Sequence, residues 1–557
     1  MNMSKVPNYS NPSASAHQFA MIPRADIPRS SFRMQHAHKT TFSASALIPV
    51  YVEEVLPGDS FHLKMTAFSR LATQIYPVMD NMYLESFFFF VPNRLVWTNW
   101  VKFMGEQDNP GDSISYTVPL TTSPVGGFAR NNIYDYMGLP CTGQVGAGNT
   151  VQCITLPMRA YNLIYNTWFR DENLQNSVPK NMGDGPDAQS DYVVQLRGKR
   201  HDYFTSALPF VQKGTAVSLP LSGTALVKTS ATDDFTSGTN TLRGHVIGGT
   251  ITNATHPTIS MAGTGTANNP LEVNTAPVGS GTQLPWYPSN LFADLTTATA
   301  TTINALRQSF QIQKLLERDA RGGTRYTEIV RSHFGVISPD ARLQRPEFLG
   351  GGSSPVQVMP VAQQTQTGVT GGTTPLGTLG GIGANLARDH GFSRAFTEHG
   401  HIIGIVSVRA DLTYQQGKRK MWSRQTRYDY YFPVFSHLGE QAVLNSEIYS
   451  DGSATDPQVF GYQERWAEYR YHPSMITGYF NSRATTPLDA WHLAENFASL
   501  PVLNASFVVD KNYITLQRTS AAGATSLNQQ FLCDIFFDVK AARPMPLYSV
   551  PGLVDHF

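Results

Sequence analysis

Alternation of apolar and polar residues marks the clearest strands in this chain. Every second residue is apolar in Ser60–Phe68, in Ile405–Leu412 and in Phe531–Lys540. Because neighbouring side chains of a strand point to opposite faces, each segment predicts a strand with one buried face. Tyr83–Val91 differs, because it contains four consecutive phenylalanines. This run predicts a strand that is covered on both faces.

Apolar residues at helical spacing occupy parts of the long intervals between these strands. Helices are predicted at Trp97–Met104, Met158–Phe169, Ile303–Arg318 and Tyr326–Phe334. Val356–Gln364 is a weaker strand candidate. The Gly- and Thr-rich run Thr365–Ala384 is predicted to be a long loop.

The spacing of the predicted strands decides the fold class. Strong strands lie near residues 60, 85, 405 and 535, so the sheet must pair segments that are distant in sequence. A parallel doubly wound sheet would need a helix after each strand, and no fixed period suggests a solenoid. The pattern predicts a mainly β protein, a jelly roll of two packed antiparallel sheets with long helical and loop insertions.

Composition changes on either side of a predicted hinge at Gly198–Gly214. From Gly214 to Ala300 only six residues are charged, and Thr, Ser, Gly, Ala and Asn dominate. We therefore expect one body that a long insertion interrupts. The predicted parts are an extended basic N-terminal arm (residues 1–45), the first part of the jelly-roll body (46–213), an insertion forming an outward protrusion (214–295) and the remainder of the body (296–557).

Overall charge and hydrophobicity limit the candidate partners and compartments. The 557 residues are 41% hydrophobic and 15% charged, and a formal net charge of +1 means that a polyanion must be bound by a local patch. Residues 1–20 lack the charged start and apolar centre of a signal peptide. No apolar run reaches the roughly 18 residues of a membrane helix. These features predict assembly in a cytoplasm.

Clusters that look like catalytic or metal sites lack the partners that such chemistry requires. The three cysteines match neither a zinc knuckle nor a disulfide framework, and we expect reduced thiols. His36 and His38 have no carboxylate or cysteine beside them to complete a metal site. Lys199–Tyr203 contains an acid, a base and a phenol, but sequence neighbours do not by themselves form a catalytic geometry. We predict no enzyme, no catalytic residues, no metal and no cofactor.

Two stretches combine clustered cations with few carboxylates. The predicted nucleic-acid-binding residues are Lys418, Arg419, Lys420, Trp422, Arg424 and Arg427 in the first stretch and Arg24, Arg29 and Arg33 in the N-terminal arm. Cations interleaved with aromatic rings suit single-stranded nucleic acid, because phosphates need countercharge and bases stack on flat rings. A solvated basic loop, or a basic edge that pairs with a neighbour's carboxylates, is the alternative.

Several motifs, in order along nearly the whole chain, carry a resemblance to a known family. They are His36–Phe42, Glu85–Trp97, His201–Ser206, Asp340–Gly351, Ala410–Gly417 and Gly461–Arg470. In these motifs the chain resembles the major capsid proteins of the Microviridae, small phages with single-stranded DNA, and within them the gokushovirus branch.

The resemblance implies a viral jelly roll, an eight-stranded antiparallel barrel, in a T=1 icosahedral shell built from one type of coat chain. It implies packaged circular single-stranded DNA and a virion component that is assembled in the host bacterial cytoplasm. The insertion would form protrusions at the threefold axes and attach to a host-cell surface receptor. Further implied partners are an internal scaffolding protein, a DNA pilot protein and a small basic DNA-binding protein. The alternative function is a β-rich surface adhesin or glycan-binding protein.

Overall fold

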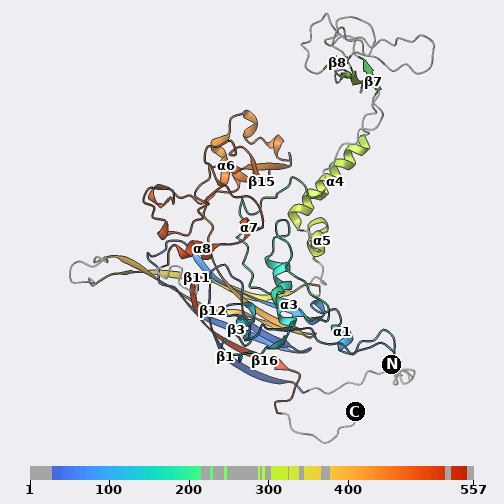
Figure 1. The fold of residues 1–557 in the computed structure, drawn as a ribbon, viewed down its shortest axis with the longest axis vertical. Helices are drawn as coiled ribbons and strands as arrows, with labels where there is room; N and C mark the ends of the chain where they lie inside the picture. The colour runs from blue at the N-terminus through green and yellow to red at the C-terminus, as the bar shows by residue number, and fades with distance from the viewer. Residues whose placement is uncertain are drawn as a thin grey trace, which may run out of the picture. The chain divides into compact units, whose positions relative to one another are not determined.

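A computed structural model gives the fold (Figure 1). The structure describes residues 28–214, 226–229, 244–246, 286–288, 291–294, 303–323, 325–337, 344–364, 377–520 and 529–548. It divides the chain into two compact units, Met1–Val211 with Gly322–Phe557, and Gln212–Arg321. The domain boundaries expected from composition remain a prediction.

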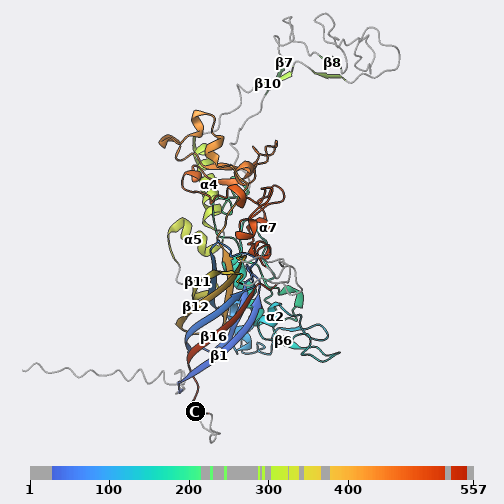
Figure 2. The same ribbon diagram turned by 90° about the vertical axis from the view of Figure 1, so that its left-hand side faces the viewer.

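The first unit is organised by an eight-stranded antiparallel sheet with the strand order β1-β16-β3-β12-β11-β4-β13-β2. Its strands are β1 (Ser30–Phe42), β2 (Ile48–Val55), β3 (Ser60–Leu71), β4 (Met82–Pro92), β11 (Glu347–Ala362), β12 (Leu379–Ala395), β13 (Gly400–Ala410) and β16 (Phe531–Arg543). The sheet curves into a near-barrel whose two halves share one core (Figure 2). This architecture confirms the mainly β, jelly-roll prediction.

The alternating pattern of β3 explains how this core forms. Phe61, Leu63, Met65 and Ala67 are buried, whereas the residues between them are exposed or half-buried. β16 shows the same alternation and pairs with β3 along its length. Each strand therefore contributes one apolar face to the core and leaves the other face outside.

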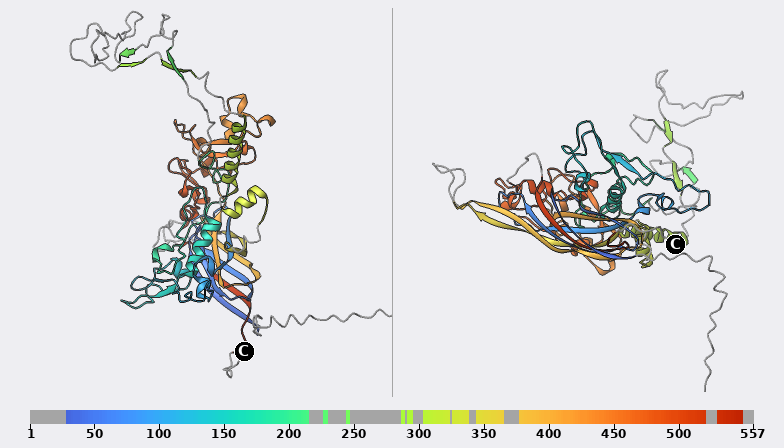
Figure 3. Two further views of the ribbon diagram at one scale, coloured as in Figure 1. Left: turned by 90° about the vertical axis from the view of Figure 1, so that its right-hand side faces the viewer. Right: turned by 90° about the horizontal axis from the view of Figure 1, so that it is seen from below.

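The phenylalanine run of β4 is buried on both faces, as predicted. Phe88 and Phe90 belong to the core inside the near-barrel. Phe89 belongs to a second apolar cluster on the other side of the sheet, together with Trp97 and Tyr161. Tyr161 lies in α3 (Leu156–Ile164), which continues as a π-helical turn at Tyr165–Phe169. The insertion that follows β4 thus covers the outer face of this half of the sheet (Figure 3).

Two side chains connect the end strands β1 and β2, between which no backbone ladder is present among the described residues. His38 Nδ1 lies 2.9 Å from the Val50 carbonyl oxygen. The His36 ring stacks on Tyr51 and Phe537, with centroid distances of 5.9 and 5.1 Å. These two histidines therefore have structural contacts across the gap in the near-barrel.

The other helices and strands lie in the long connections between the strands of the eight-stranded sheet. The shorter elements of the first unit are α1 (Trp100–Phe103), β5 (Leu120–Thr122), α2 (Ile133–Tyr136), β6 (Gln152–Ile154), α5 (Tyr326–Phe334), β14 (Glu440–Leu444), α6 (Asn445–Ile448), β15 (Val459–Glu464), α7 (Ala505–Val508) and α8 (Asn512–Gln517). The second unit contains α4 (Ile303–Gly322) and two ladders, β7 (Leu226–Thr229) with β10 (Leu291–Asp294) and β8 (Gly244–Val246) with β9 (Trp286–Pro288). No described helix has the length and hydropathy to span a bilayer.

Several local predictions need correction. Ser30–Phe42 was expected to lie in an extended arm, but it is β1 and pairs with β16. Residues 379–384 were assigned to a loop, but they begin β12, and residues 365–376 lie outside the described part. The helix predicted at Trp97–Met104 is reduced to the single turn α1. In contrast, α5 has the predicted bounds.

Candidate nucleic-acid interface

The basic and aromatic segment from Lys418 to Tyr431 follows β13 in the long connection to β16. It contains short 3-10 turns at Lys420–Ser423 and Arg427–Asp429. The second turn begins with a capping interaction, because the Thr426 backbone N–H and hydroxyl donate to Asp429 Oδ2 at 2.7 and 2.9 Å. These bonds lower the pKa of Asp429 and hold the turn in place.

Part of this segment presents cations and rings to solvent. Trp422 is 71% exposed and Tyr428 is 66% exposed. Lys418, Arg419 and Arg427 form no ion pair with any residue that the structure describes. The Arg427 guanidinium lies 5.5 Å from the Phe432 ring centroid. The exposed part of the segment therefore combines positive charge with flat rings, the combination that was predicted to contact single-stranded nucleic acid.

Two predicted binding cations are instead committed to contacts inside the chain. Lys420 Nζ donates to the Ala442 carbonyl at 2.7 Å and lies 3.5 Å from Glu447 Oε1. Arg424 forms a 3.1 Å ion pair with Glu468 and lies 4.3 Å from the Tyr469 ring centroid. Because removing one partner of a buried pair leaves the other charge uncompensated, Lys420 and Arg424 have a structural role here.

A cavity of about 420 Å³ adjoins the segment. Arg419, Met421, Tyr469 and Tyr471 are among its lining residues. At its wall the Tyr203 hydroxyl donates to Glu447 at 2.9 Å, and burial raises the pKa of Glu447. The exposed residues Lys418 and Arg427 thus lie on the same segment as a partly aromatic hollow.

The predicted arm residues separate into two groups. Arg24 lies outside the described residues. Arg29 donates to the Gly58 carbonyl, and Arg33 Nη2 forms a 2.9 Å ion pair with Asp538 across the β1–β16 ladder. Arg29 and Arg33 therefore attach the start of β1 to its neighbours.

The Lys199–Tyr203 stretch contributes to a network of buried and half-buried charges. Glu85 accepts from Arg197, from Arg200 Nη2 at 3.2 Å and from Arg409 Nη2 at 3.3 Å. These guanidinium groups lower the pKa of Glu85 although burial opposes them. The arrangement joins β4 and β13 to the segment that leads toward the second unit, and it explains this charged stretch as structural.

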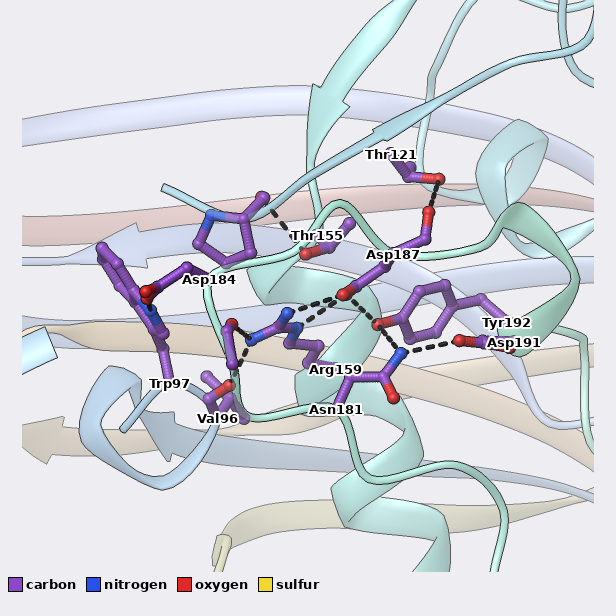
Figure 4. Close-up of polar contacts among 12 residues, drawn as sticks. Val96, Trp97, Thr121, Thr155, Arg159, Asn181, Asp184, Asp187, Asp191 and Tyr192 are labelled. Carbon is purple, nitrogen blue, oxygen red and sulfur yellow. Dashed lines mark hydrogen bonds and ion pairs between the residues drawn. The ribbon is translucent and has the colours of Figure 1, made fainter. Parts of the chain in front are cut away.

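Figure 4 shows a second structural node, centred on the buried Arg159 of α3. Its guanidinium donates twice to Asp187, at 2.7 Å each, and to the carbonyls of Val96 and Gly183 at 3.0 and 2.8 Å. The Tyr192 hydroxyl donates to the same carboxylate at 2.5 Å. The node fixes the loop 183–192 against α3, and each of the three guanidinium nitrogens donates at least one hydrogen bond.

Neither metal nor thiol chemistry is indicated in the described part of the chain. No group of three or more His, Cys, Asp or Glu side chains is positioned to hold a metal ion there. The three cysteines are free, and burial raises the pKa of Cys141 and Cys153 to about 11. Such thiols remain protonated near neutral pH.

Comparison with known proteins decides the family. Residues 20–553 match the family model described as capsid protein (F protein). The chain belongs to the F-type capsid proteins of the Microviridae. It is therefore the major capsid protein of a single-stranded DNA phage, a structural and non-enzymatic component of the virion, and copies of it form a shell. The comparisons thus support the capsid function and not the adhesin alternative.

Three capsid relatives support this assignment over nearly their whole length. Capsid protein VP1 of Bdellovibrio phage phiMH2K is 45% identical over 551 residues, which is 97% of this chain and 98% of the relative. Capsid protein VP1 of Chlamydia phage 1 is 42% identical over 605 residues, with the same coverage. Capsid protein VP1 of Spiroplasma virus 4 is 36% identical over 557 residues.

Proposed function

We propose that this capsid protein builds a T=1 icosahedral shell around circular single-stranded DNA, and that the exposed part of Lys418–Tyr431 contacts the genome. The observation that carries the genome contact is the exposed Trp422, flanked by Lys418, Arg419 and Arg427 without described ion-pair partners. Rings of this kind stack on any base, and stacking is worth roughly 1–3 kcal/mol per base.

The low net charge of the chain supports a local contact. A formal charge of +1 per chain gives the shell little long-range attraction for DNA. Cations that have no internal carboxylate partner remain available for phosphates, whereas Lys420 and Arg424 do not. We therefore propose that Lys420 and Arg424 hold the binding segment in place and do not themselves bind phosphates. Binding by Arg24 and Arg29 is proposed as an auxiliary contact from the start of the chain, whereas Arg33, which pairs with Asp538, has a supporting role as Lys420 and Arg424 do.

We assign host attachment to the insertion 214–295, which belongs to the unit Gln212–Arg321, as protrusions at the threefold axes. Its scarcity of charge and its abundance of Thr, Ser and Gly suit turns displayed to solvent and free to vary. A host-cell surface receptor would be the partner of this unit. The internal scaffolding protein, the DNA pilot protein and the small basic DNA-binding protein are proposed as partners of the body.

The genome contact is tested by replacing the free cations of the segment. Lys418→Gln, Arg419→Gln and Arg427→Gln are introduced together, and Lys102→Gln, Lys180→Gln and Lys511→Gln form the matched control. We expect normal shell assembly by the first variant but a lower ratio of DNA-filled to empty particles in a density gradient. The proposal is overturned if the two variants fill equally well.

A further inference from the structure

One face of β1, β16, β3 and β12 lies outside the near-barrel core. In the strand registers, Lys39, Asp534, Phe68 and Leu386 form one row across the four strands. All four are exposed, whereas the residues beside them along the strands, such as Ala67 and Ile535, are buried. The four strands are neighbours in the sheet order and their ribbons lie side by side in Figure 1, so their outward side chains form one continuous face. We call it the outer sheet face.

The outer sheet face carries more large apolar side chains than a solvated antiparallel sheet requires. Phe68 is 48% exposed and Phe536 is 43% exposed, and they occupy diagonal positions on β3 and β16. Leu532 and Leu386 are also exposed beside them. A sheet with one wet face normally places polar residues there. Exposed apolar groups gathered on one face indicate a binding surface.

The same face has an excess of positive charge. Its cations are Arg33, Lys39, Lys64, Arg70, Arg388 and Lys540, and its carboxylates are Asp389, Asp534 and Asp538. Three cations pair with these carboxylates, Arg33 at 2.9 Å, Lys39 at 2.5 Å and Lys64 at 3.4 Å. Arg70, Arg388 and Lys540 form no ion pair with a described residue. The face thus holds three unmatched cations in a chain whose net charge is only +1.

A hollow at one end of the outer sheet face brings the rings and the cations together. It has a volume of about 570 Å³ and is lined by Lys39, Phe68, Arg70, Arg130 and Leu532 among others. This volume lies in the roughly 300–1,000 Å³ range of small-molecule sites. The cations Lys39, Arg70 and Arg130 outnumber the carboxylates Asp135 and Asp534 in this hollow. An aromatic wall with a net positive rim suits a flat ring that carries a phosphate.

We propose that the outer sheet face is a stacking platform for single-stranded nucleic acid, with bases on Phe68 and Phe536 and phosphates on Arg70, Arg388 and Lys540. Sheets with exposed aromatic residues bind single strands in this way, because every base offers a flat face. The inference rests on the proposed enclosure of single-stranded DNA. It adds a second genome contact that is separate from Lys418–Tyr431. This contact is made by the outward-facing residues of the strands, which alternate with the buried ones.

A protein ligand is the competing occupant and fits the face less well. An acidic peptide would satisfy the unpaired cations, but the cations flank two exposed rings that are diagonal neighbours on adjacent strands. A repeating polymer of phosphates and flat rings matches both features at once. Contact with a neighbouring capsid copy would instead bury the face and exclude DNA from it.

Ultraviolet crosslinking of DNA in intact particles, followed by peptide mass spectrometry, tests the platform without any mutation. We expect nucleotide adducts on the peptides that contain Phe68 and Phe536. Adducts confined to other peptides, such as those from Lys418–Tyr431, would overturn the platform and leave the proposed function intact. A complete absence of adducts anywhere in the chain would overturn both.

Variants then test the three free cations. In particles carrying Arg70→Gln, Arg388→Gln and Lys540→Gln, we expect the crosslink yield on the β3 and β16 peptides to fall at least threefold. The matched control, Lys102→Gln with Lys180→Gln and Lys511→Gln, should retain the parental yield. Equal yields in both variants would contradict the phosphate role. If the first variant does not assemble, the charge-preserving variant Arg70→Lys with Arg388→Lys and Lys540→Arg must retain the yield.

Discussion

His38 of β1 donates its Nδ1–H to the backbone carbonyl of Val50 in β2, at 2.9 Å. The direction of this bond is fixed, because a carbonyl oxygen can only accept. It connects the two end strands of the sheet order, where no ladder runs among the described residues. The near-barrel is therefore closed at this position by a side chain.

Replacing His38 should weaken this closure. We expect His38→Ala to lower the free energy of unfolding by about 1 kcal/mol, the usual net contribution of one hydrogen bond. His437 is exposed and makes no side-chain hydrogen bond, ion pair or ring contact with a described residue, so His437→Ala provides the control. Thermal unfolding of both variants measures the difference. Equal melting temperatures would show that the bond to Val50 contributes nothing to stability.

Acid should destabilise the fold through His401. Its Nδ1 lies 2.8 Å from Asn93 Oδ1, and burial lowers the pKa of His401 from 6.5 to about 4. Between these two values the unfolded chain binds a proton that the folded chain does not, so stability falls as the pH falls from 6.5 towards 4. The loss should reach about 3 kcal/mol. Denaturant titrations at several pH values in this window measure how the free energy of unfolding changes with pH. This change should be smaller for His401→Gln than for the parent, and an equal change would contradict the assignment.

The Arg159 node should be intolerant of losing one partner. Arg159→Met leaves the buried Asp187 carboxylate without its two guanidinium bonds, and such changes cost about 3–5 kcal/mol. Adding Asp187→Asn should restore part of the stability, because the uncompensated charge is removed. Soluble yield and melting temperature measure both effects, with the exposed Lys180→Met as the control. A single variant as stable as the parent would show that the node is dispensable.

Gly391 in β12 leaves no space for a side chain. A Cβ at this position would overlap the Leu63 carbonyl of the paired strand β3. We expect Gly391→Ala to disrupt the β3–β12 ladder and to abolish shell assembly. Gly111 has no atom within 4 Å of an added Cβ, so Gly111→Ala should assemble normally. Electrophoresis of assembled particles compares the two, and normal assembly by Gly391→Ala would contradict the predicted overlap.

The strands that could be predicted from the sequence are those with a clear pattern of apolar side chains. β3 and β16 alternate clearly, and β4 contains four consecutive phenylalanines, so all three were predicted. Most of β11 and the whole of β12 were missed, and both strands contain several glycines. A Cβ on Gly351 would collide with the Ser86 carbonyl, and one on Gly383 with the Leu71 side chain. Where strands approach this closely, glycines take the place of the apolar side chains whose alternation predicts a strand.

The residue types of the candidate site could be predicted from the sequence, but the ion-pair partners of its cations could not. The cations and rings of Lys418–Tyr431 are visible in the sequence. Their internal partners are not, because Glu447 and Glu468 lie 27 and 44 residues from Lys420 and Arg424. The outer sheet face was missed for a different reason. Phe68 and Phe536 occupy the outward phase of their strands, and only the register between strands shows that they are neighbours.

Electron cryomicroscopy of purified particles would show the shell and its genome together. We expect a closed T=1 icosahedral shell of one coat chain, with the eight-stranded near-barrel as its wall and nucleic-acid density against the outer sheet face. Particles with a different symmetry, or a shell in which the outer sheet face points to the exterior solvent and DNA density lies elsewhere, would contradict this expectation.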